Sequence, residues 1–124
     1  MKQLLLIAGG GAAGSVLRYL MALGVYGIFG RAFPYGTLVV NISGCFIMGL
    51  LAAILLERVT YANELRGLLL IGFLGGYTTF SSFAVETLNL VENGEMMLAC
   101  TNVLLSVVLC LVAVWLGLVI GRQI

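Results

Sequence analysis

Polar and charged residues divide the chain into four long apolar segments. These segments cover approximately residues 4–29, 35–56, 65–90 and 96–120. Each is long enough to cross the hydrocarbon core of a bilayer as a helix, which takes about 20 residues. The pattern therefore predicts an all-α membrane protein with four transmembrane helices, folded as a single domain over residues 1–124.

Short polar stretches at residues 30–31, 57–64 and 92–95 separate the four segments, and the second of them includes Thr60. An even number of crossings places both termini on one side of the membrane. Basic residues are more numerous on that side, where they are Lys2, Arg58, Arg66 and Arg122. The positive-inside rule therefore favours cytoplasmic termini.

The composition excludes several classes of protein. Hydrophobic residues make up 62% of the chain and charged residues only 9%, and the mean hydropathy is +1.18. A soluble domain carries about 25% charged residues, so this chain belongs in a lipid bilayer. The net charge of +1 and the lack of a basic run argue against nucleic-acid binding.

The usual residues of catalysis are also scarce. The chain has no His, and its three cysteines (Cys45, Cys100 and Cys110) lie in apolar segments without CxxC spacing. We interpret them as buried thiols without a chemical role. No nucleophile is paired with a base, and we predict that the protein is not an enzyme.

The chain has 17 glycines, which point to close contacts between helices. Small residues recur four positions apart in the pairs Gly10/Gly14, Gly72/Gly76, Ala113/Gly117 and Gly117/Gly121. We interpret most of these pairs as helix-packing surfaces, and some of them as a surface between subunits.

Two stripes of polar residues have helical spacing inside the apolar segments. One consists of Thr37, Asn41 and Cys45, and the other of Asn102, Ser106 and Cys110. Such a stripe either joins helices by hydrogen bonds or faces a water-filled path. Two stripes of weak donors without a carboxylate suit the partial dehydration of an anion better than a path for cations or protons.

Apart from Arg66 at the start of the third segment, two charged residues fall within the apolar segments. Arg18 lies deep in the first segment and is a candidate functional residue, with a structural arginine that reaches the interface as the alternative. Glu86 is the only acidic residue that falls within a segment, and we expect it near the interface at the end of the third helix.

The third segment carries an unusual mixture of glycine, hydroxyl and aromatic residues, GFLGGYTTFSSF at positions 72–83. Adjacent glycines weaken a helix and hydroxyl groups offer its backbone other partners, so the pattern predicts a third helix that is broken in mid-membrane. Unwound carbonyls at such a break can coordinate Na⁺. Phe80 and Phe83 are expected to share a face just beyond the break.

These residues resemble the Fluc (CrcB-like) family of fluoride channels. Three motifs carry the resemblance in order: GGAAGSVLRY at 10–19, GTLVVNISGCF at 36–46, and the third-segment motif at 72–83. The resemblance covers nearly the whole chain.

The resemblance implies an antiparallel, dual-topology homodimer in the cell inner membrane that lets fluoride leave the cytoplasm passively. It implies a structural Na⁺ at the dimer centre, held by the main-chain carbonyls of Gly75 and Thr78, and Arg18 at a vestibule. It also implies a fluoride path, whose residues in this chain are Phe80, Phe83, Asn41, Ser81, Thr37, Asn102 and Ser106.

A small dual-topology, proton-coupled exporter of the multidrug type is the alternative. That class also has four helices, but it needs an ionisable carboxylate in mid-membrane. Here the first segment carries Arg18 instead, and Glu86 is poorly placed for that role.

Overall fold

The computed structural model describes residues 1–58 and 62–124, and within them every regular element is helical. The elements are α1 (Lys2–Phe29), α2 (Tyr35–Glu57), α3 (Asn63–Leu65), η1 (Arg66–Leu74), α4 (Gly75–Tyr77), α5 (Ser81–Glu92) and α6 (Met96–Gln123). The predicted all-α class is confirmed. Thr60, in the expected second turn, lies outside the described residues.

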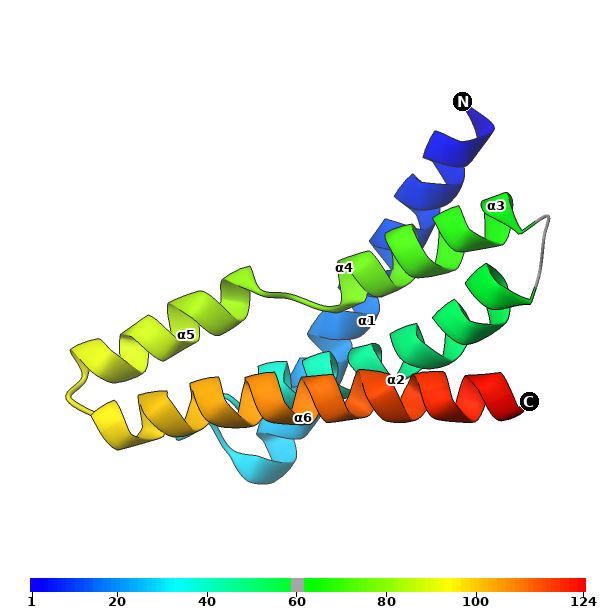
Figure 1. Cartoon of the computed structure of the whole chain (residues 1–124). Helices are drawn as coiled ribbons and strands as arrows, with labels where there is room; N and C mark the ends of the chain where they lie inside the picture. Colours follow the sequence, from blue (N-terminus) through cyan, green and yellow to red (C-terminus); the bar gives the residue numbers. More distant parts are fainter. Residues whose placement is uncertain (59–61) are drawn as a thin grey trace.

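In the described part of the chain, four helical segments are long and apolar enough to cross a membrane, as predicted. Three of them are the single helices α1, α2 and α6. The other is the run 63–92, in which α3, η1, α4 and α5 follow one another. Figure 1 shows α2 and α6 side by side, while α1 crosses the other elements steeply.

Both termini lie at the same end of the molecule (Figure 1). Lys2 forms an ion pair with Glu64 of α3 at 2.7 Å, and Arg122 forms one with Glu57 of α2 at 2.8 Å. The opposite end contains the turns that follow α1 and α5, where Gly30 and Gly94 adopt positive φ. This arrangement agrees with an even number of membrane crossings.

Glycines allow two pairs of helices to pack with their backbones in contact. A side chain at Gly49 would meet the carbonyl of Val114, and one at Gly117 would meet the carbonyl of Phe46. α2 and α6 therefore approach closely along a parallel path. Small residues promote this kind of packing between helices in lipid.

The contact of α1 with η1 and α4 is built from two of the predicted small-residue pairs. Gly10 and Gly14 on α1 face backbone atoms of Leu68 and Phe73, and Gly72 and Gly76 face backbone atoms of α1 in return. The interpretation of these pairs as packing surfaces is confirmed.

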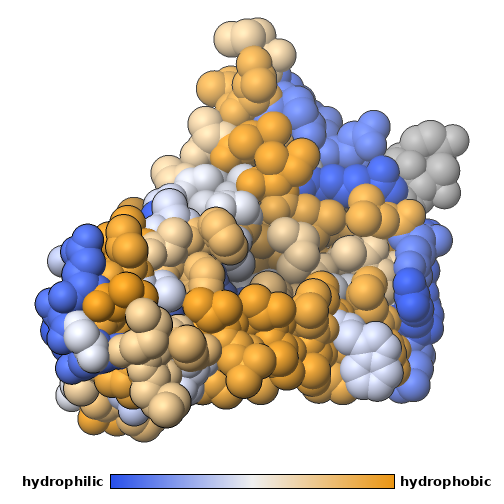
Figure 2. Space-filling model, turned by 60° about the vertical axis from the view of Figure 1, so that its left-hand side comes forward, coloured by the Kyte–Doolittle hydropathy of each residue, from blue (hydrophilic) through white to orange (hydrophobic). Residues whose placement is uncertain are grey.

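The outer surface of the molecule is strongly apolar. Large side chains of α1 and α6 are exposed, including Leu4, Val16, Leu104 and Trp115. Figure 2 shows a broad hydrophobic surface between hydrophilic residues at two ends of the molecule. A bilayer or another protein surface must cover this area, because exposing so much apolar surface to water is energetically unfavourable.

The third segment departs from α-helical geometry at two places. Residues 66–74 form the π-helix η1, and residues 78–80 between α4 and α5 are not helical. Thr78 has extended backbone angles, with φ −81° and ψ 156°. Gly75 itself is helical, with φ −61° and ψ −38°. The chain therefore leaves helical geometry at Thr78, the first threonine of the motif, whereas Gly75 remains helical.

Candidate functional site

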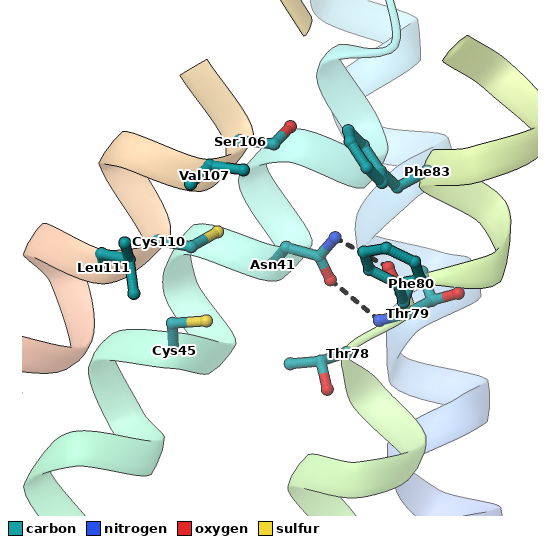
Figure 3. A pocket seen from close by; sticks show the side chains of 10 residues that line it. All are labelled: Asn41, Cys45, Thr78, Thr79, Phe80, Phe83, Ser106, Val107, Cys110 and Leu111. Atoms are coloured by element: carbon teal, nitrogen blue, oxygen red, sulfur yellow. Dashed lines mark hydrogen bonds between the residues drawn. The ribbon is translucent and has the colours of Figure 1, made fainter. Parts of the chain in front are cut away.

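A cavity of about 340 Å³ lies between α2, α6 and the segment that joins α4 to α5 (Figure 3). It brings together five of the predicted site residues, namely Asn41, Thr78, Phe80, Phe83 and Ser106. The remaining lining residues are Thr79, Cys45, Cys110, Val107 and Leu111. The cavity thus gathers the last two members of each polar stripe.

Asn41 joins α2 to the non-helical residues by two hydrogen bonds. Its Nδ2 donates to the carbonyl of Thr79 at 2.8 Å, and its Oδ1 accepts from the backbone N–H of Thr79 at 2.8 Å (Figure 3). A carboxamide has one donor side and one acceptor side, so it can satisfy both backbone groups of one residue. A polar stripe was expected either to join helices by hydrogen bonds or to face a water-filled path. Asn41 forms such joining hydrogen bonds, and it also lines the cavity.

The same region redirects two backbone amides. In a continuous α-helix the N–H of Thr79 would bond to the carbonyl of Gly75, and that of Ser82 to the carbonyl of Thr78. Instead, Thr79 donates to Asn41, and the N–H of Ser82 donates to Oγ1 of Thr79 at 3.2 Å. The two carbonyls that lose their helical donors belong to the residues expected to bind Na⁺.

The aromatic rings of Phe80 and Phe83 lie next to each other at the cavity. Their centroids are 5.4 Å apart and their planes are inclined by 50°. Phe80 is 78% exposed, whereas Phe83 is half-buried. At this inclination the rings present both edges and faces to their surroundings, and ring edges carry positive partial charge.

A second cavity of about 270 Å³ shares one lining residue, Thr79, with the first. It contains Arg18, Thr37 and Glu86. Oγ1 of Thr37 donates to Oε1 of Glu86 at 2.7 Å. Thr37 therefore does not share a cavity with Asn41, although both belong to one stripe. Glu86 is half-buried in the same cavity as Arg18.

Asn102 and Ser81 are not brought into the first cavity. Asn102 is 2% exposed and donates to Oγ1 of Thr87 at 2.8 Å, and it accepts from Ser106 at 3.4 Å. The bond to Thr87 joins α5 to α6. Ser81 is exposed, with its hydroxyl 3.4 Å from that of Thr79.

Of the five lining residues that were not predicted as site residues, three carry a hydroxyl or thiol group, namely Thr79, Cys45 and Cys110. Thr79 has the same side-chain type as Thr78, and nothing in the motif marks it as the partner of Asn41. Cys45 and Cys110 carried a usable signal, because each is the last member of a polar stripe. The expectation of three buried thiols is wrong: Cys100 is exposed, and Cys45 and Cys110 are half-buried.

Residues 5–118 match the model of a family described as CrcB-like protein, Camphor Resistance (CrcB). The chain is 54% identical to a fluoride-specific ion channel FluC of Coxiella burnetii and 53% identical to one of Geobacter sulfurreducens, over 98% and 99% of both chains.

A protein of the same name from Methylococcus capsulatus is 53% identical over 98% of this chain, which spans 53% of that relative's length. Matches of this extent and identity establish kinship along the whole chain. The chain therefore belongs to the CrcB-like family, the family of the Fluc fluoride channels.

Proposed function

We propose that the protein is a passive, fluoride-selective ion channel that exports fluoride from the cytoplasm and so lowers its toxicity. The observation that carries the proposal is the first cavity. It combines the amide of Asn41, the hydroxyls of Thr78 and Ser106 and the rings of Phe80 and Phe83, and no acidic residue lines it in the described part of the chain. Relatives that are about half identical along their whole length are named fluoride-specific ion channels.

The chemistry of fluoride suits these groups. Fluoride is small and strongly hydrated, so a path must replace its water with hydrogen-bond donors and must not trap it. Hydroxyl groups can donate, and phenyl ring edges offer a weak positive field without a formal charge. Sites of this kind bind an anion weakly enough for it to leave, which conduction requires.

We propose an antiparallel, dual-topology homodimer as the working unit. A single chain leaves Phe80 78% exposed beside the cavity, and it leaves large apolar surfaces on α1 and α6. A second copy packed on this side would complete the wall of the path. The fluoride path would then also be closed to lipid.

The Na⁺ of the proposal is structural and would be held by the carbonyls of Gly75 and Thr78 from both subunits. The donor set fits, because the amides of Thr79 and Ser82 are directed elsewhere and Gly75 is exposed at the surface. Carbonyl oxygens are suitable ligands for a hard cation at a helix break. In the described residues no group of three or more His, Cys, Asp or Glu offers another metal site.

We place the protein in the inner membrane, with the break of the third segment in mid-membrane. We propose no enzymatic activity for it. Arg18 would attract fluoride at the vestibule formed by the second cavity. The proton-coupled exporter gains no support from the comparisons, because the relatives reported above are named as channels.

Fluoride efflux from liposomes tests the proposal. Purified protein in liposomes loaded with KF or KCl is diluted into low-K⁺ buffer, valinomycin is added, and ion-selective electrodes record the efflux. We expect rapid fluoride efflux and no chloride efflux above that of protein-free liposomes. Equal rates for the two anions, or fluoride efflux that requires a proton gradient, would contradict the proposal.

Matched variants connect the flux to the cavity. Phe80→Ile and Phe83→Ile keep the apolar character but remove the ring edges, so we expect fluoride efflux about tenfold slower, which corresponds to about 1.4 kcal/mol in the barrier. Phe29→Ile, at the far end of α1 and outside this cavity, is the control. Normal efflux in both cavity variants would shift the path to Asn41 and the hydroxyl groups.

A further inference from the structure

Two thiols from different helices line the first cavity. Cys45 lies on α2 and Cys110 on α6, and both are half-buried. Figure 3 shows both side chains extending from neighbouring helices into the same cavity, on the side of Asn41 away from Phe83. Neither residue has a role in the proposed function.

We propose that Cys45 and Cys110 form a two-thiolate binding site for a soft, thiophilic cation of low coordination number, such as Hg²⁺ or Ag⁺. Thiolate sulfur selects soft cations over hard ones. Among the described residues, the cavity offers these two thiols and no His or carboxylate, so the four ligands that Zn²⁺ needs are not available. A cation that is satisfied by two ligands fits this donor set.

The packing of the helices holds the two thiols in a fixed relation. Gly49 and Gly117 bring the backbones of α2 and α6 into direct contact one to two turns away from the cysteines. The other residues near the thiols offer little competition, since Leu111 and Val107 are apolar and the amide of Asn41 is bonded to Thr79. A cation that binds one thiol therefore meets the second one at high effective concentration.

Binding involves proton release and no electron transfer. Each S–H bond breaks and its proton passes to water, and each sulfur forms a bond to the cation. Loading of one Hg²⁺ thus releases two protons, so apparent affinity falls as pH falls. The bound cation would lie beside Asn41 and Thr78 and would obstruct the cavity. This last consequence depends on the proposed function, whereas the binding itself does not.

The test measures Hg²⁺ binding on the full-length protein in detergent, in chloride-free buffer. Cys100→Ser serves as the background, because Cys100 is exposed and lies outside the cavity. In this background we expect one Hg²⁺ per chain by native mass spectrometry and the ultraviolet band of sulfur-to-mercury charge transfer. Adding Cys45→Ser or Cys110→Ser should weaken binding about 100-fold, because either change removes the chelate.

Equal affinity in the background and in both single variants would overturn the site, as would a stoichiometry of one Hg²⁺ bridging two chains. Size-exclusion chromatography confirms that the serine variants fold like the background. Serine differs from cysteine by one atom, so a general loss of folding is not expected.

Fluoride efflux measurements distinguish failure of the Hg²⁺ site from failure of the proposed fluoride channel function. We expect micromolar Hg²⁺ to stop efflux through the Cys100→Ser protein and to leave efflux unchanged in a protein with Ser at positions 45, 100 and 110, which has no thiol to bind the cation. Hg²⁺ binding without any fluoride efflux in untreated protein would refute the proposed function and support the site. Continued efflux through protein that has one Hg²⁺ bound would refute the obstruction.

Discussion

Asn41 is the residue that connects the fold of this protein to its cavity. Its carboxamide satisfies the N–H and the carbonyl of Thr79, two groups that a helix would otherwise satisfy. An unpaired backbone group in an apolar interior costs about 1–3 kcal/mol, so the extended conformation at Thr78 depends on this side chain. The same side chain lines the cavity, so we expect a change here to affect stability and, under the proposed function, conduction.

Substitutions at Asn41 measure how much each of its two hydrogen bonds contributes to the free energy of unfolding. Asn41→Ala removes both and should lower the free energy of unfolding by about 2–4 kcal/mol. Asn41→Asp keeps an acceptor for the N–H of Thr79 but has no donor for its carbonyl, so we expect an intermediate loss. The measurement is thermal denaturation in detergent, followed by the fluorescence of Trp115.

Cys45→Ser is a matched control for Asn41→Ala, because it lies one turn further along α2 and lines the same cavity. Its stability should change by less than about 1 kcal/mol. If Asn41→Ala were as stable as this control, the hydrogen bonds to Thr79 would not support the non-helical segment.

At the scale of elements, the third segment packs against α1 through direct backbone contacts. η1 and α4 lie on the glycine face of α1, where a side chain at Gly14 would meet the carbonyl of Phe73 and, at 3.0 Å, the N–H of Tyr77. This contact fixes α4 immediately before the chain turns away at Thr78. The glycines of α1 therefore position the cavity without lining it.

Gly14→Ala tests this contact. The added methyl group has no space against the backbone of Phe73, so we expect a loss of about 1–3 kcal/mol in the free energy of unfolding and a lower fluoride flux. Gly24→Ala on the same helix is the control, since a methyl group added there would meet no packed atom within 4 Å. Thermal denaturation and efflux are measured on both, and equal stability would show that α1 can move away from η1 at no cost.

At the scale of the whole molecule, charges gather at two ends and apolar side chains cover the surface between them (Figure 2). Two basic residues at the terminal end form ion pairs with acidic ones, Lys2 with Glu64 and Arg122 with Glu57. Orientation in the membrane responds to the excess of Lys and Arg on one side. Here that excess amounts to a few residues, a small bias that suits the proposed dual topology.

Accessibility labelling tests the dual topology. A single cysteine added after Ile124, in a background with Ser at positions 45, 100 and 110, is labelled in intact cells with a membrane-impermeant maleimide. We expect about half of the chains to react from outside, because the two copies of an antiparallel dimer insert in opposite directions. A cysteine in a cytosolic protein of the same cells controls for leakage. Labelling of none or all of the chains would contradict the antiparallel dimer.

The amino-acid sequence by itself determined the all-α class of the protein and its four segments of membrane-spanning length. Apolar runs of membrane length can only be helices in a bilayer, since each backbone group must find its partner within the segment. Charged residues at the ends of these runs mark the turns. Spacing of four also identified the packing faces of Gly10/Gly14 and Gly72/Gly76, because residues at this spacing share one side of a helix.

Only the tertiary structure decided how the polar residues are distributed between the two cavities. Helical periodicity places Thr37, Asn41 and Cys45 on one face, but it does not say which neighbour covers each turn of that face. Thr79, which follows the extended residue Thr78, lines both cavities. Thr37 donates to Glu86 in one cavity, whereas Asn41 bonds to Thr79 in the other. Asn102 is likewise directed to Thr87 and not to the cavity. These partners are 15 to 49 positions apart along the chain, and contacts at such separations arise from packing, which local pattern does not encode.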